Sequence, residues 1–594
     1  MNQQDLLKKA YEAYKNKDLE ISKNYYLEIL KIDEKNSEAL GNLGVIYRAL
    51  GDNKKAYEYY IKAINVNPKD SITYNNLGNL LKDTKNYKVA LKVYADGIRV
   101  DPKNYHGYNN IGMVFEKLND NEKAIQAYKD AVRINPNFDK AVNNIGVILY
   151  QQKKYQQAID IFKIALKINP KYTELHSNIG ACFNKLKKYD EAIENLDKAI
   201  ASNPKNAGAY TNLGNVYNKL HEYKKATKLH EKAIELEPNG YNAYSNVGTS
   251  YKNLGFTTKA INSYKKAIEL KPDFENAHFD LATIYLSKGD FKKGWKEYEW
   301  RFRKEEMRGH IFNNKDIFSQ PMFTGKEDVS GKTILLHSEQ GFGDSIQLIR
   351  FLPQFKEKFD CKIAVKCRDE LKELFKHIKE IDILTNRSES TPEFDYHLSI
   401  MSMPYVLDIA STKELIVKTP YLSVPNKNIF GIKKEKGKIN VGICWSASVT
   451  SESYEERVLE LESFLPFINN DKINLYSLQL GPDKEDIKKL ELEDKIIDIT
   501  DRLIDFSKTA DLVQNLDLVV SSDTSIVHLC GALNIPTLVM VPKIPDWRWQ
   551  TKGETSDWYK SVKIFRQKQN RNWKPVFQSL FAKMNKEYKL KLKV

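Results

Sequence analysis

The hydrophobic pattern of the chain changes near its middle. Between residues 3 and 308, apolar side chains recur at helical spacing, in paired segments separated by short polar turns. From residue 331, short β-rich runs such as KTILLHSE and LDLVVSSD alternate with helical segments. The pattern therefore predicts an all-helical first part followed by an α/β second part.

The helical part follows a period of 34 residues, marked by seven prolines. They are Pro68, Pro102, Pro136, Pro170, Pro204, Pro238 and Pro272. In repeats that begin at residue 37 and every 34 residues after it, the eighth residue is always glycine. The twentieth is always alanine, and the twenty-seventh is alanine or glycine. Small residues there predict two helices that approach each other closely.

This repeat resembles the tetratricopeptide repeat family over residues 1–308, with a divergent first repeat at 3–36 and a degenerate last one at 275–308. A helical pair of this kind cannot bury its apolar face alone, so the repeats stack. The resemblance implies an α-solenoid, a tetratricopeptide superhelix with a long concave surface that binds other chains.

The sixth residue of each of the seven repeats is asparagine, a mediocre helix former. These residues are Asn42, Asn76, Asn110, Asn144, Asn178, Asn212 and Asn246. A carboxamide has two donor hydrogens and an acceptor, so such a row predicts binding of a polypeptide main chain. The row is similar to one in the repeat domain of protein O-linked N-acetylglucosamine transferases. The alternative is that each Asn bonds a neighbouring repeat.

Two sets of βα units are predicted in the second part. We place the first at residues 309–425 and the second at 426–570, with a linker near 420–437 and a basic helix at 571–594. Two open parallel sheets joined by a linker form a GT-B architecture of two Rossmann-like halves, with ligands at the carboxyl ends of the strands. A single larger Rossmann domain is the competing layout.

The first candidate site residue is Asp344, in the segment SEQGFGDSIQLIRFLP. A strand ends at Glu339, glycines permit a tight turn, and Asp344 opens a helix. Its carboxylate has two candidate roles: a helix cap, or a base that takes a proton from an acceptor hydroxyl.

Two weaker motifs follow the strands of the second half. Arg457 follows the strand and turn of VGICWSAS, and Gln479 stands at a strand end in LYSLQLGP. The amide of Gln479 has two candidate roles: contact with a base or ribose, or a structural one.

A stronger motif is LDLVVSSDTSIVHLCGAL, where an apolar strand ends at Asp523. Thr524 and Ser525 begin the next helix, where free N–H groups and the helix dipole favour a phosphate. His528 lies on the same face of the first turn and can reach a pyrophosphate. The alternative is a buried histidine with hydroxyl residues that only cap the helix.

Residues 331 to about 570 resemble the glycosyltransferase family 9 (heptosyltransferase-like) domains. The resemblance rests on EQGFGDSIQ, GICW, the arginine before VLEL, LYSLQLGP, DTSIVHLCGAL, and PDWRW followed by WYKSVKIFRQ, in the family's order. It implies a metal-independent GT-B transferase with a nucleotide-diphosphate sugar as donor.

By this resemblance Asp344 matches the family's candidate base. The family's donor-binding turn is matched by four residues: Asp523, Thr524, Ser525 and His528. Trp547 and Arg548 match a segment of the repeat-bearing members, where a ring or guanidinium could stack on a base or sugar. The stretch SASVTSESYEER departs from the family's Gly-Asn-Pro turn and nearby His, so an inactive domain is an open alternative.

No metal site or bound cofactor is predicted. His337, His377 and His397 have no partnering Cys or His at ligand spacing. In a GT-B enzyme, helix N-termini and basic side chains neutralise the leaving diphosphate instead, and Arg457 and Arg548 are the candidates.

Composition adds little about partners. The 594 residues carry a net charge of +15, but both signs alternate, as on solvated helix faces, which does not favour nucleic-acid binding. The terminal segment 571–594 is predominantly basic; it is a candidate for contact with an anionic membrane surface, or else a solvated helix. No apolar leader or membrane-spanning run is present, and five cysteines without a CxxC pair indicate a reducing cytoplasm.

The sequence therefore predicts a cytoplasmic glycosyltransferase that moves a sugar from a nucleotide-diphosphate sugar to a hydroxyl, with the repeats recruiting a polypeptide or other acceptor. The alternative is a tetratricopeptide protein-interaction scaffold whose transferase-like domain is catalytically degenerate.

Overall fold

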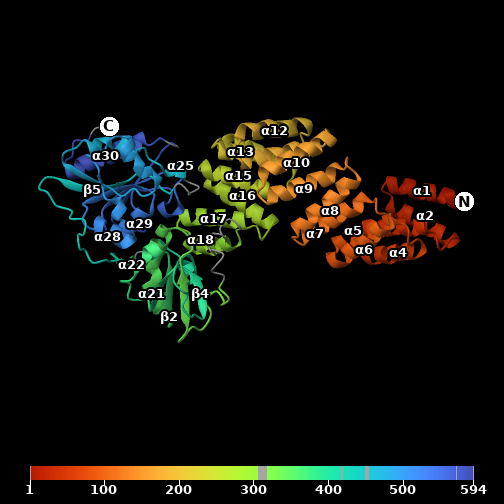
Figure 1. The fold of residues 1–594 in the computed structure, drawn as a ribbon, viewed down its shortest axis with the longest axis horizontal. Coiled ribbons are helices and arrows are strands. Elements are labelled where there is room, and N and C mark those ends of the chain that lie inside the picture. Colours follow the sequence, from red (N-terminus) through yellow and green to blue (C-terminus); the bar gives the residue numbers. More distant parts are fainter. Residues whose placement is uncertain (1, 305–317, 416–418, 449–453, 570–571, 593–594) are drawn as a thin grey trace. The chain divides into compact units, whose positions relative to one another are not determined.

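The structure of the chain, a computed structural model, describes residues 2–304, 318–415, 419–448, 454–569 and 572–592. It divides into two compact units, residues 1–239 and residues 240–594. Figure 1 shows the first unit as helices alone and the second as helices followed by two sheets.

The described residues of the first unit form fourteen helices, arranged as seven hairpin pairs. They are α1 (Gln3–Lys15), α2 (Leu19–Ile32), α3 (Ser37–Ala49), α4 (Asn53–Val66), α5 (Ser71–Asp83), α6 (Tyr87–Val100), α7 (Tyr105–Lys117), α8 (Asn121–Ile134), α9 (Asp139–Gln151), α10 (Tyr155–Ile168), α11 (Glu174–Lys185), α12 (Tyr189–Ser202), α13 (Ala207–Lys219) and α14 (Tyr223–Leu236). This run of helical pairs is a tetratricopeptide solenoid, as the period predicts.

The glycine at the eighth position makes room for a ring in six of the seven repeats and for Leu196 in the repeat of Gly180. A Cβ on Gly44 of α3 would lie 2.5 Å from the ring of Tyr60 on α4, and one on Gly78 would lie 2.4 Å from Tyr94. Both tyrosines are fully buried. The predicted close approach of the paired helices is confirmed, and its cause is an aromatic side chain of the second helix.

Four more helices and a short 3₁₀ turn begin the second unit: α15 (Tyr241–Asn253), α16 (Thr257–Leu270), α17 (Glu275–Ser287), α18 (Phe291–Tyr298) and η1 (Glu299–Arg303). The predicted boundary at residue 309 lies outside the described residues. We call the segment from α17 to η1, residues 275–303, the terminal repeat.

The first sheet, sheet A, has the order β3-β2-β1-β4, with all strands parallel. Its strands are β1 (Thr333–His337), β2 (Lys362–Cys367), β3 (Ile383–Asn386) and β4 (Tyr396–Ser399). The connecting helical segments are α20 (Phe342–Leu348), η2 (Ile349–Phe351), α21 (Leu352–Lys358), η3 (Asp369–Leu371), α22 (Lys372–Phe375), η4 (Ile400–Ser402), α23 (Met403–Val406) and α24 (Thr412–Leu415).

The second sheet, sheet B, is parallel with the order β10-β9-β8-β5-β6-β7. Its strands are β5 (Ile439–Cys444), β6 (Ile473–Ser477), β7 (Ile497–Asp498), β8 (Leu518–Ser522), β9 (Thr537–Val541) and β10 (Val562–Arg566). The chain moves outward from β5, returns to the middle and moves outward again from β8, which is a doubly wound order. The strand order reverses between β5 and β8, where ligands of such sheets bind.

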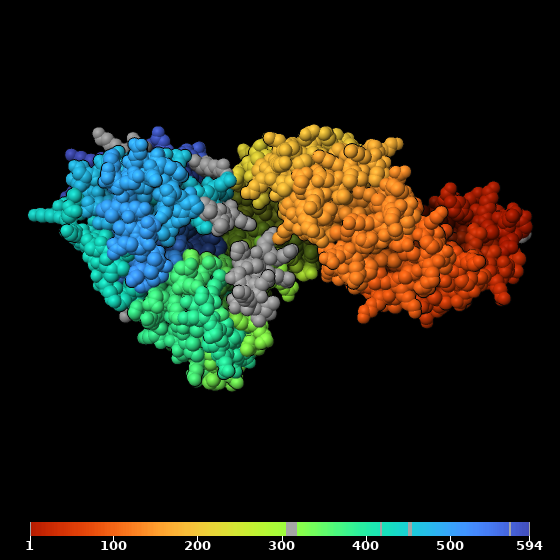
Figure 2. All heavy atoms as spheres, viewed as in Figure 1, coloured from red at the N-terminus to blue at the C-terminus, as the bar shows by residue number. Residues whose placement is uncertain are grey.

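The helical segments around sheet B include two that matter for the site, α29 (Ser525–Ala532) and η8 (Trp547–Trp549). The others are α25 (Tyr454–Arg457), η5 (Leu461–Phe464), α26 (Leu465–Ile468), η6 (Pro482–Glu485), α27 (Asp486–Lys489), η7 (Thr500–Arg502), α28 (Phe506–Val513) and α30 (Lys574–Tyr588). In Figure 1 the strands of sheet A are green and those of sheet B are teal to blue, and we call the two regions the sheet A lobe and the sheet B lobe. Figure 2 shows the surfaces of these regions in the same colours.

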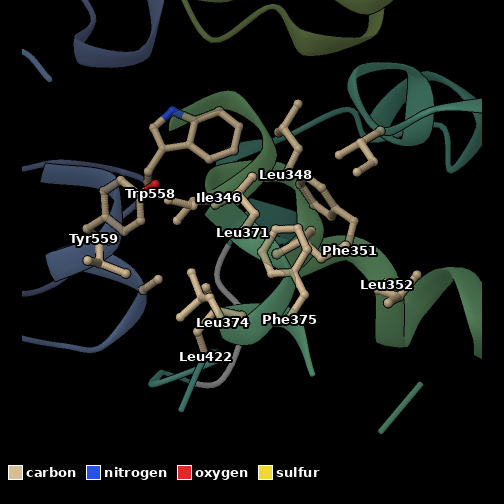
Figure 3. Close-up of a cluster of buried hydrophobic side chains, with 14 of the residues drawn as sticks. Ile346, Leu348, Phe351, Leu352, Leu371, Leu374, Phe375, Leu422, Trp558 and Tyr559 are labelled. Carbon is tan, nitrogen blue, oxygen red and sulfur yellow. The ribbon is translucent and has the colours of Figure 1, made fainter. Parts of the chain in front are cut away.

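One hydrophobic core joins the terminal repeat to both lobes. It contains Trp295 of α18, Leu371 beside sheet A, and Trp558 and Tyr559 next to sheet B. Figure 3 shows Trp558 and Tyr559 beside Ile346 of α20 and other apolar side chains of the sheet A lobe. The two lobes are therefore packed directly against each other.

The predicted linker is extended but fixed. The described residues between α24 and β5 form no helix or strand. The main-chain N–H of Tyr421 donates to Ala532 O over 3.1 Å, and Asp511 accepts from the N–H groups of Lys427, Asn428 and Ile429 at 2.7, 3.1 and 2.9 Å.

The terminal helix α30 is amphipathic and docked. Phe577 and Phe581 pack edge-on against Phe464 and Phe467, each with a centroid distance of 5.0 Å. Throughout the described ranges, no helix is both long and apolar enough to cross a membrane.

Candidate functional site

The reversal point of sheet B brings the ends of β5 and β8 together. Thr524 follows β8 and is the N-cap of α29, and its Oγ1 lies 3.9 Å from Sγ of Cys444, the last residue of β5. Among the described residues, the Thr524 side chain makes no capping hydrogen bond to this helix. Both Thr524 and Ser525 are only half-buried. The first turn of α29 therefore presents main-chain N–H groups without a side-chain cap from Thr524.

Arg457 brings a positive charge to the same helix start. Its Nη1 donates to Asp523 O over 3.1 Å and lies 3.9 Å from Asp523 Oδ2. Burial raises the pKa of the Asp523 carboxyl to about 6, although the Arg457 guanidinium opposes that shift. Arg457 thus lies at the start of α29, and its role toward a diphosphate stays a prediction.

His528 is a buried, neutral ring. Its Nδ1 lies 2.9 Å from the Tyr559 hydroxyl, and the ring stacks on Trp549 with a centroid distance of 5.5 Å. Burial, together with the nearby Arg548, Arg350 and Arg457 guanidinium groups, holds the pKa of His528 well below its ordinary value. This environment favours the buried-histidine interpretation over a proton-donating one.

Asp344 stabilises the start of α20 and also forms an ion pair. The N-cap is Gly341, whose N–H donates to Asp344 Oδ2 over 2.7 Å. The other oxygen, Oδ1, is bonded to Arg548 Nη2. Burial raises the pKa of Asp344, and the Arg548 guanidinium opposes that rise. The side chain keeps only 17% of its exposure, so the carboxylate is largely buried between the lobes but not sealed from solvent.

The helices that carry Asp344 and His528 touch. A Cβ on Gly343 of α20 would lie 2.6 Å from Cδ2 of His528 on α29. Only a glycine fits there without a shift, which accounts for the second glycine of the EQGFGD segment. The helix that Asp344 opens and the helix that Thr524 caps are thus in direct contact.

Arg548 makes hydrogen bonds within its own turn and to the sheet A lobe. Besides Asp344, it donates through Nη1 to Asp546 Oδ1 over 2.8 Å and through Nε to Gln347 Oε1 over 2.6 Å. Its side chain is 8% exposed. In this arrangement Arg548 neutralises Asp344 rather than standing free for a diphosphate.

The prediction that Trp547 stacks on a ligand is not supported. Its ring packs perpendicular to Trp295 of α18 at a centroid distance of 5.3 Å, and it also contacts Tyr298 and Trp558. Trp547 is buried because it seats the terminal repeat on the sheet B lobe. Trp295 is fully buried on the other side of this contact.

The amide of Gln479 is also taken by protein partners. Its Oε1 accepts from the N–H groups of Trp445 and Ser446 at 3.0 and 2.8 Å, and its Nε2 donates to Ser446 Oγ and Leu480 O at 2.9 and 2.8 Å. Gln479 is buried, so this geometry corrects the assignment to a ligand and favours the structural role. It fixes the turn after β5, where Ser446 and Tyr454 both donate to Asp483.

Three of the repeat asparagines form bonds between repeats. The Nδ2 atoms of Asn144, Asn178 and Asn212 donate to Asn109 Oδ1, Asn143 Oδ1 and Ser177 Oγ, each over 3.2 Å. Each acceptor is the fifth residue of the preceding repeat. These contacts match the alternative role of the asparagine row, in which each Asn bonds a neighbouring repeat. Only the Nδ2 atoms of Asn144, Asn178 and Asn212 take part in them, and the Oδ1 atoms of these three residues do not.

Sequence reasoning missed the residues that support Asp344 and His528. Asp546, Gln347 and Tyr559 all stand inside the segments PDWRW, EQGFGDSIQ and WYKSVKIFRQ, so their place in these motifs was a usable signal. Arg301 of η1, which pairs with Glu339, gave no such signal. Within the residues that the structure describes, no group of three His, Cys, Asp or Glu side chains is placed to hold a metal.

Comparisons with known proteins match the repeats. Residues 3–243 match the family described as the Cilia and flagella-associated protein 70 C-terminal domain, and residues 257–289 match a TPR repeat family. Protein FlbA of Caulobacter vibrioides is 22% identical over 314 residues, which cover 48% of this chain and 51% of FlbA. The chain thus spans about half the length of this curated relative.

Solved tetratricopeptide structures are similar to parts of the chain. The protein YrrB is 25% identical, covering 31% of this chain and 95% of its own, with a TM-score of 0.26. MamA is 28% identical, covering 28% and 92%, with a TM-score of 0.24. A repeat protein of Parabacteroides merdae is 18% identical, covering 42% and 98%, with a TM-score of 0.36. The matched families identify residues 3–243 and 257–289 as tetratricopeptide repeats.

Proposed function

We propose that the two α/β lobes form a GT-B glycosyltransferase that transfers a sugar from a nucleotide-diphosphate sugar to an acceptor hydroxyl. The observation that carries this proposal is the approach of two helix starts. The first turn of α29, with Thr524 and Arg457, lies at the reversal point of sheet B, and α29 touches the helix of Asp344 at Gly343. A diphosphate site and a carboxylate base would then share one junction.

The donor diphosphate would bind at the first turn of α29. Small hydroxyl side chains at Thr524 and Ser525 leave room for phosphate oxygens, and main-chain N–H groups and the helix dipole stabilise their charge. Arg457 adds a cation at this turn. Together these groups would stabilise the leaving nucleoside diphosphate without a metal, as the family resemblance implies.

Asp344 would act as the base. Each of its oxygens accepts one hydrogen bond from the protein, so each keeps a lone pair. As the acceptor oxygen forms a bond to the anomeric carbon, its proton would pass to Asp344, while the bond from that carbon to the diphosphate breaks. Burial raises the pKa of Asp344, which makes the carboxylate a stronger base than an exposed aspartate.

The repeat array would recruit the acceptor. Tetratricopeptide solenoids present concave surfaces to other chains, so the partner we propose is a polypeptide, held in part through the Oδ1 atoms of the asparagine row. The five cysteines are free and buried, which accords with a reducing cytoplasm as the place of action.

A second candidate is a protein-interaction scaffold with an inactive transferase-like domain. It is favoured by the pairing of Asp344 with Arg548 and by the burial of His528, since both would also serve a purely structural junction.

A panel of nucleotide sugars and the matching nucleoside diphosphates tests the two candidates with the full chain. The transferase should show a higher melting temperature with at least one donor and slow release of its nucleoside diphosphate. No stabilisation and no hydrolysis across the panel would contradict the transferase and support the scaffold.

A further inference from the structure

The loop that carries Asp344 is held by the terminal repeat as well as by its own lobe. Glu339, five residues before Asp344, accepts from Arg301 of η1 through both oxygens, with Nε to Oε1 at 2.6 Å and Nη2 to Oε2 at 3.0 Å. Both side chains are fully buried. This bidentate pair lies at the carboxyl end of β1, where the order of sheet A reverses toward β4.

The Arg301 guanidinium has further partners in the terminal repeat itself and in the sheet A lobe. Nη2 donates to Ser402 Oγ at the end of η4 over 2.7 Å, and Nη1 donates to Glu299 and to Tyr298 O. Ser402 also donates to Glu299 over 2.9 Å. One guanidinium thus serves two carboxylates, and each of the three charged groups is hydrogen-bonded. These bonds hold the buried Arg301 side chain in one geometry between η1, the loop after β1 and η4.

Tyr298 makes a second connection to the same loop. Its hydroxyl lies 3.3 Å from Gln340 Oε1 and 3.2 Å from Gln340 Nε2, and that Nε2 donates to Glu339 Oε1 over 3.1 Å. Tyr298 is almost fully buried and its ring also contacts Trp547, the neighbour of Arg548.

Both partners of the Asp344 ion pair are therefore supported by the same repeat. The loop from Ser338 to Asp344 is held by Arg301 and Tyr298, and the η8 turn that carries Arg548 is packed against Trp295 and Tyr298. The terminal repeat therefore contacts both elements that carry the ion pair.

We propose that Arg301 and Tyr298 are positioning residues that the repeat array supplies to the candidate site. This inference deepens the proposed function and, for its effect on turnover, rests on it. Neither residue touches the reacting atoms; they act through Glu339, Gln340 and the loop to Asp344.

The test compares Tyr298→Phe and Arg301→Lys with Tyr264→Phe in the full chain. Tyr298→Phe removes only the hydroxyl that contacts Gln340, and Arg301→Lys keeps the charge but loses the bidentate geometry. Tyr264 is a buried tyrosine of α16 whose hydroxyl bonds Thr249 over 3.0 Å, so it is a matched control away from the loop.

Hydrogen exchange of a peptide covering residues 338–344 is the readout that does not depend on catalysis. Exchange should be about threefold to tenfold faster in Tyr298→Phe, and faster still in Arg301→Lys, with no change in Tyr264→Phe. Wild-type exchange of this peptide in both variants would overturn the proposal. If Arg301→Lys does not fold, Tyr298→Phe alone decides.

Turnover is the second readout. If the chain transfers sugar, kcat in Tyr298→Phe should fall at least threefold with the donor KM unchanged, because only the base is displaced. An unchanged kcat would contradict the positioning role. A wild-type chain without transfer but with the expected exchange pattern would contradict the proposed function and leave the positioning of the loop supported.

Discussion

Asp344 and Arg548 form an ion pair although 204 positions separate them in the chain. One comes from the first helix of the sheet A lobe and the other from the η8 turn beside sheet B. The pair therefore fixes how the two lobes meet at the candidate site. Because a substitution of Asp344 also removes this ion pair, a test of Asp344 as a base must distinguish loss of the base from loss of the ion pair.

Replacing Asp344 with Asn should reduce transfer by about 10² to 10⁴-fold while donor binding persists, because the amide keeps the size and loses the basic charge. Turnover and donor affinity, measured separately, check this. Asp546→Asn is the matched control, since Asp546 also pairs with Arg548. An equal loss of turnover in both variants would assign the effect to Arg548 instead of to a base.

Replacing Ser525 with Leu should weaken donor binding by roughly tenfold or more, whereas Ser525→Ala should bind nearly as the wild type does. A phosphate at a helix start needs space more than it needs this hydroxyl. Isothermal titration with the donor found in the panel gives both affinities. Equal affinities in the Leu and Ala variants would place the phosphate elsewhere.

Replacing Asn178 with Ala should lower the stability of the first unit by about 0.5–1.5 kcal/mol, because an inter-repeat hydrogen bond to Asn143 is lost. Asn76→Ala is the matched control: the residue at the accepting position of the preceding repeat is Gly41, which has no side chain. Urea unfolding of the full chain measures both. A loss of polypeptide binding in Asn178→Ala without a loss of stability would favour the ligand-binding role of the row.

The raised pKa of Asp523 predicts a pH dependence of stability. With a pKa of about 6 in the folded chain against 3.8 ordinarily, the protonated form is favoured by folding. The contribution of this group is therefore most favourable below pH 4 and is lost as the pH rises to about 6. Asp523→Asn should stabilise the chain at pH 7 by on the order of 2 kcal/mol and by much less at pH 4. The free energy of unfolding, measured at pH 7 and pH 4, checks this. If Asp523→Asn changes it equally at both pH values, the pKa of Asp523 is not raised by folding.

Replacing Trp547 with Phe should lower the melting temperature and leave donor affinity unchanged, because the indole fills the core between α18 and η8. Differential scanning calorimetry and donor titration check the two parts. A specific loss of donor affinity in a fully stable variant would restore Trp547 as a stacking residue.

Sequence reasoning predicted the repeat array well because the contacts that build it are local. Gly44 and Tyr60, for example, belong to one repeat of 34 residues, and the same pair recurs in the next as Gly78 and Tyr94. The two parallel sheets also agree with the alternation of strands and helices. The repeats follow from the 34-residue period and the sheets from the alternation of apolar strands with helical segments, and both patterns can be read directly from the sequence.

The side-chain chemistry of the site was less accessible to sequence reasoning. Gln479 stands at a strand end as expected, but the turn after β5 needs its amide, and no spacing reveals that need. Trp547 and Arg548 are neighbours in sequence with different environments, one in a core and one in an ion pair. The environments of Trp547 and Arg548 depend on Trp295 and Asp344, which lie more than 200 positions away in the chain.

The shared core of the terminal repeat and the two lobes bears on how such a chain can change over evolutionary time. Whole repeats before residue 240 belong to a separate compact unit, so duplication or deletion there would lengthen or shorten the array without breaking the contacts of Arg301, Tyr298 or Trp295. The terminal repeat has no such freedom. We therefore expect the terminal repeat to vary less among related chains than the repeats ahead of it.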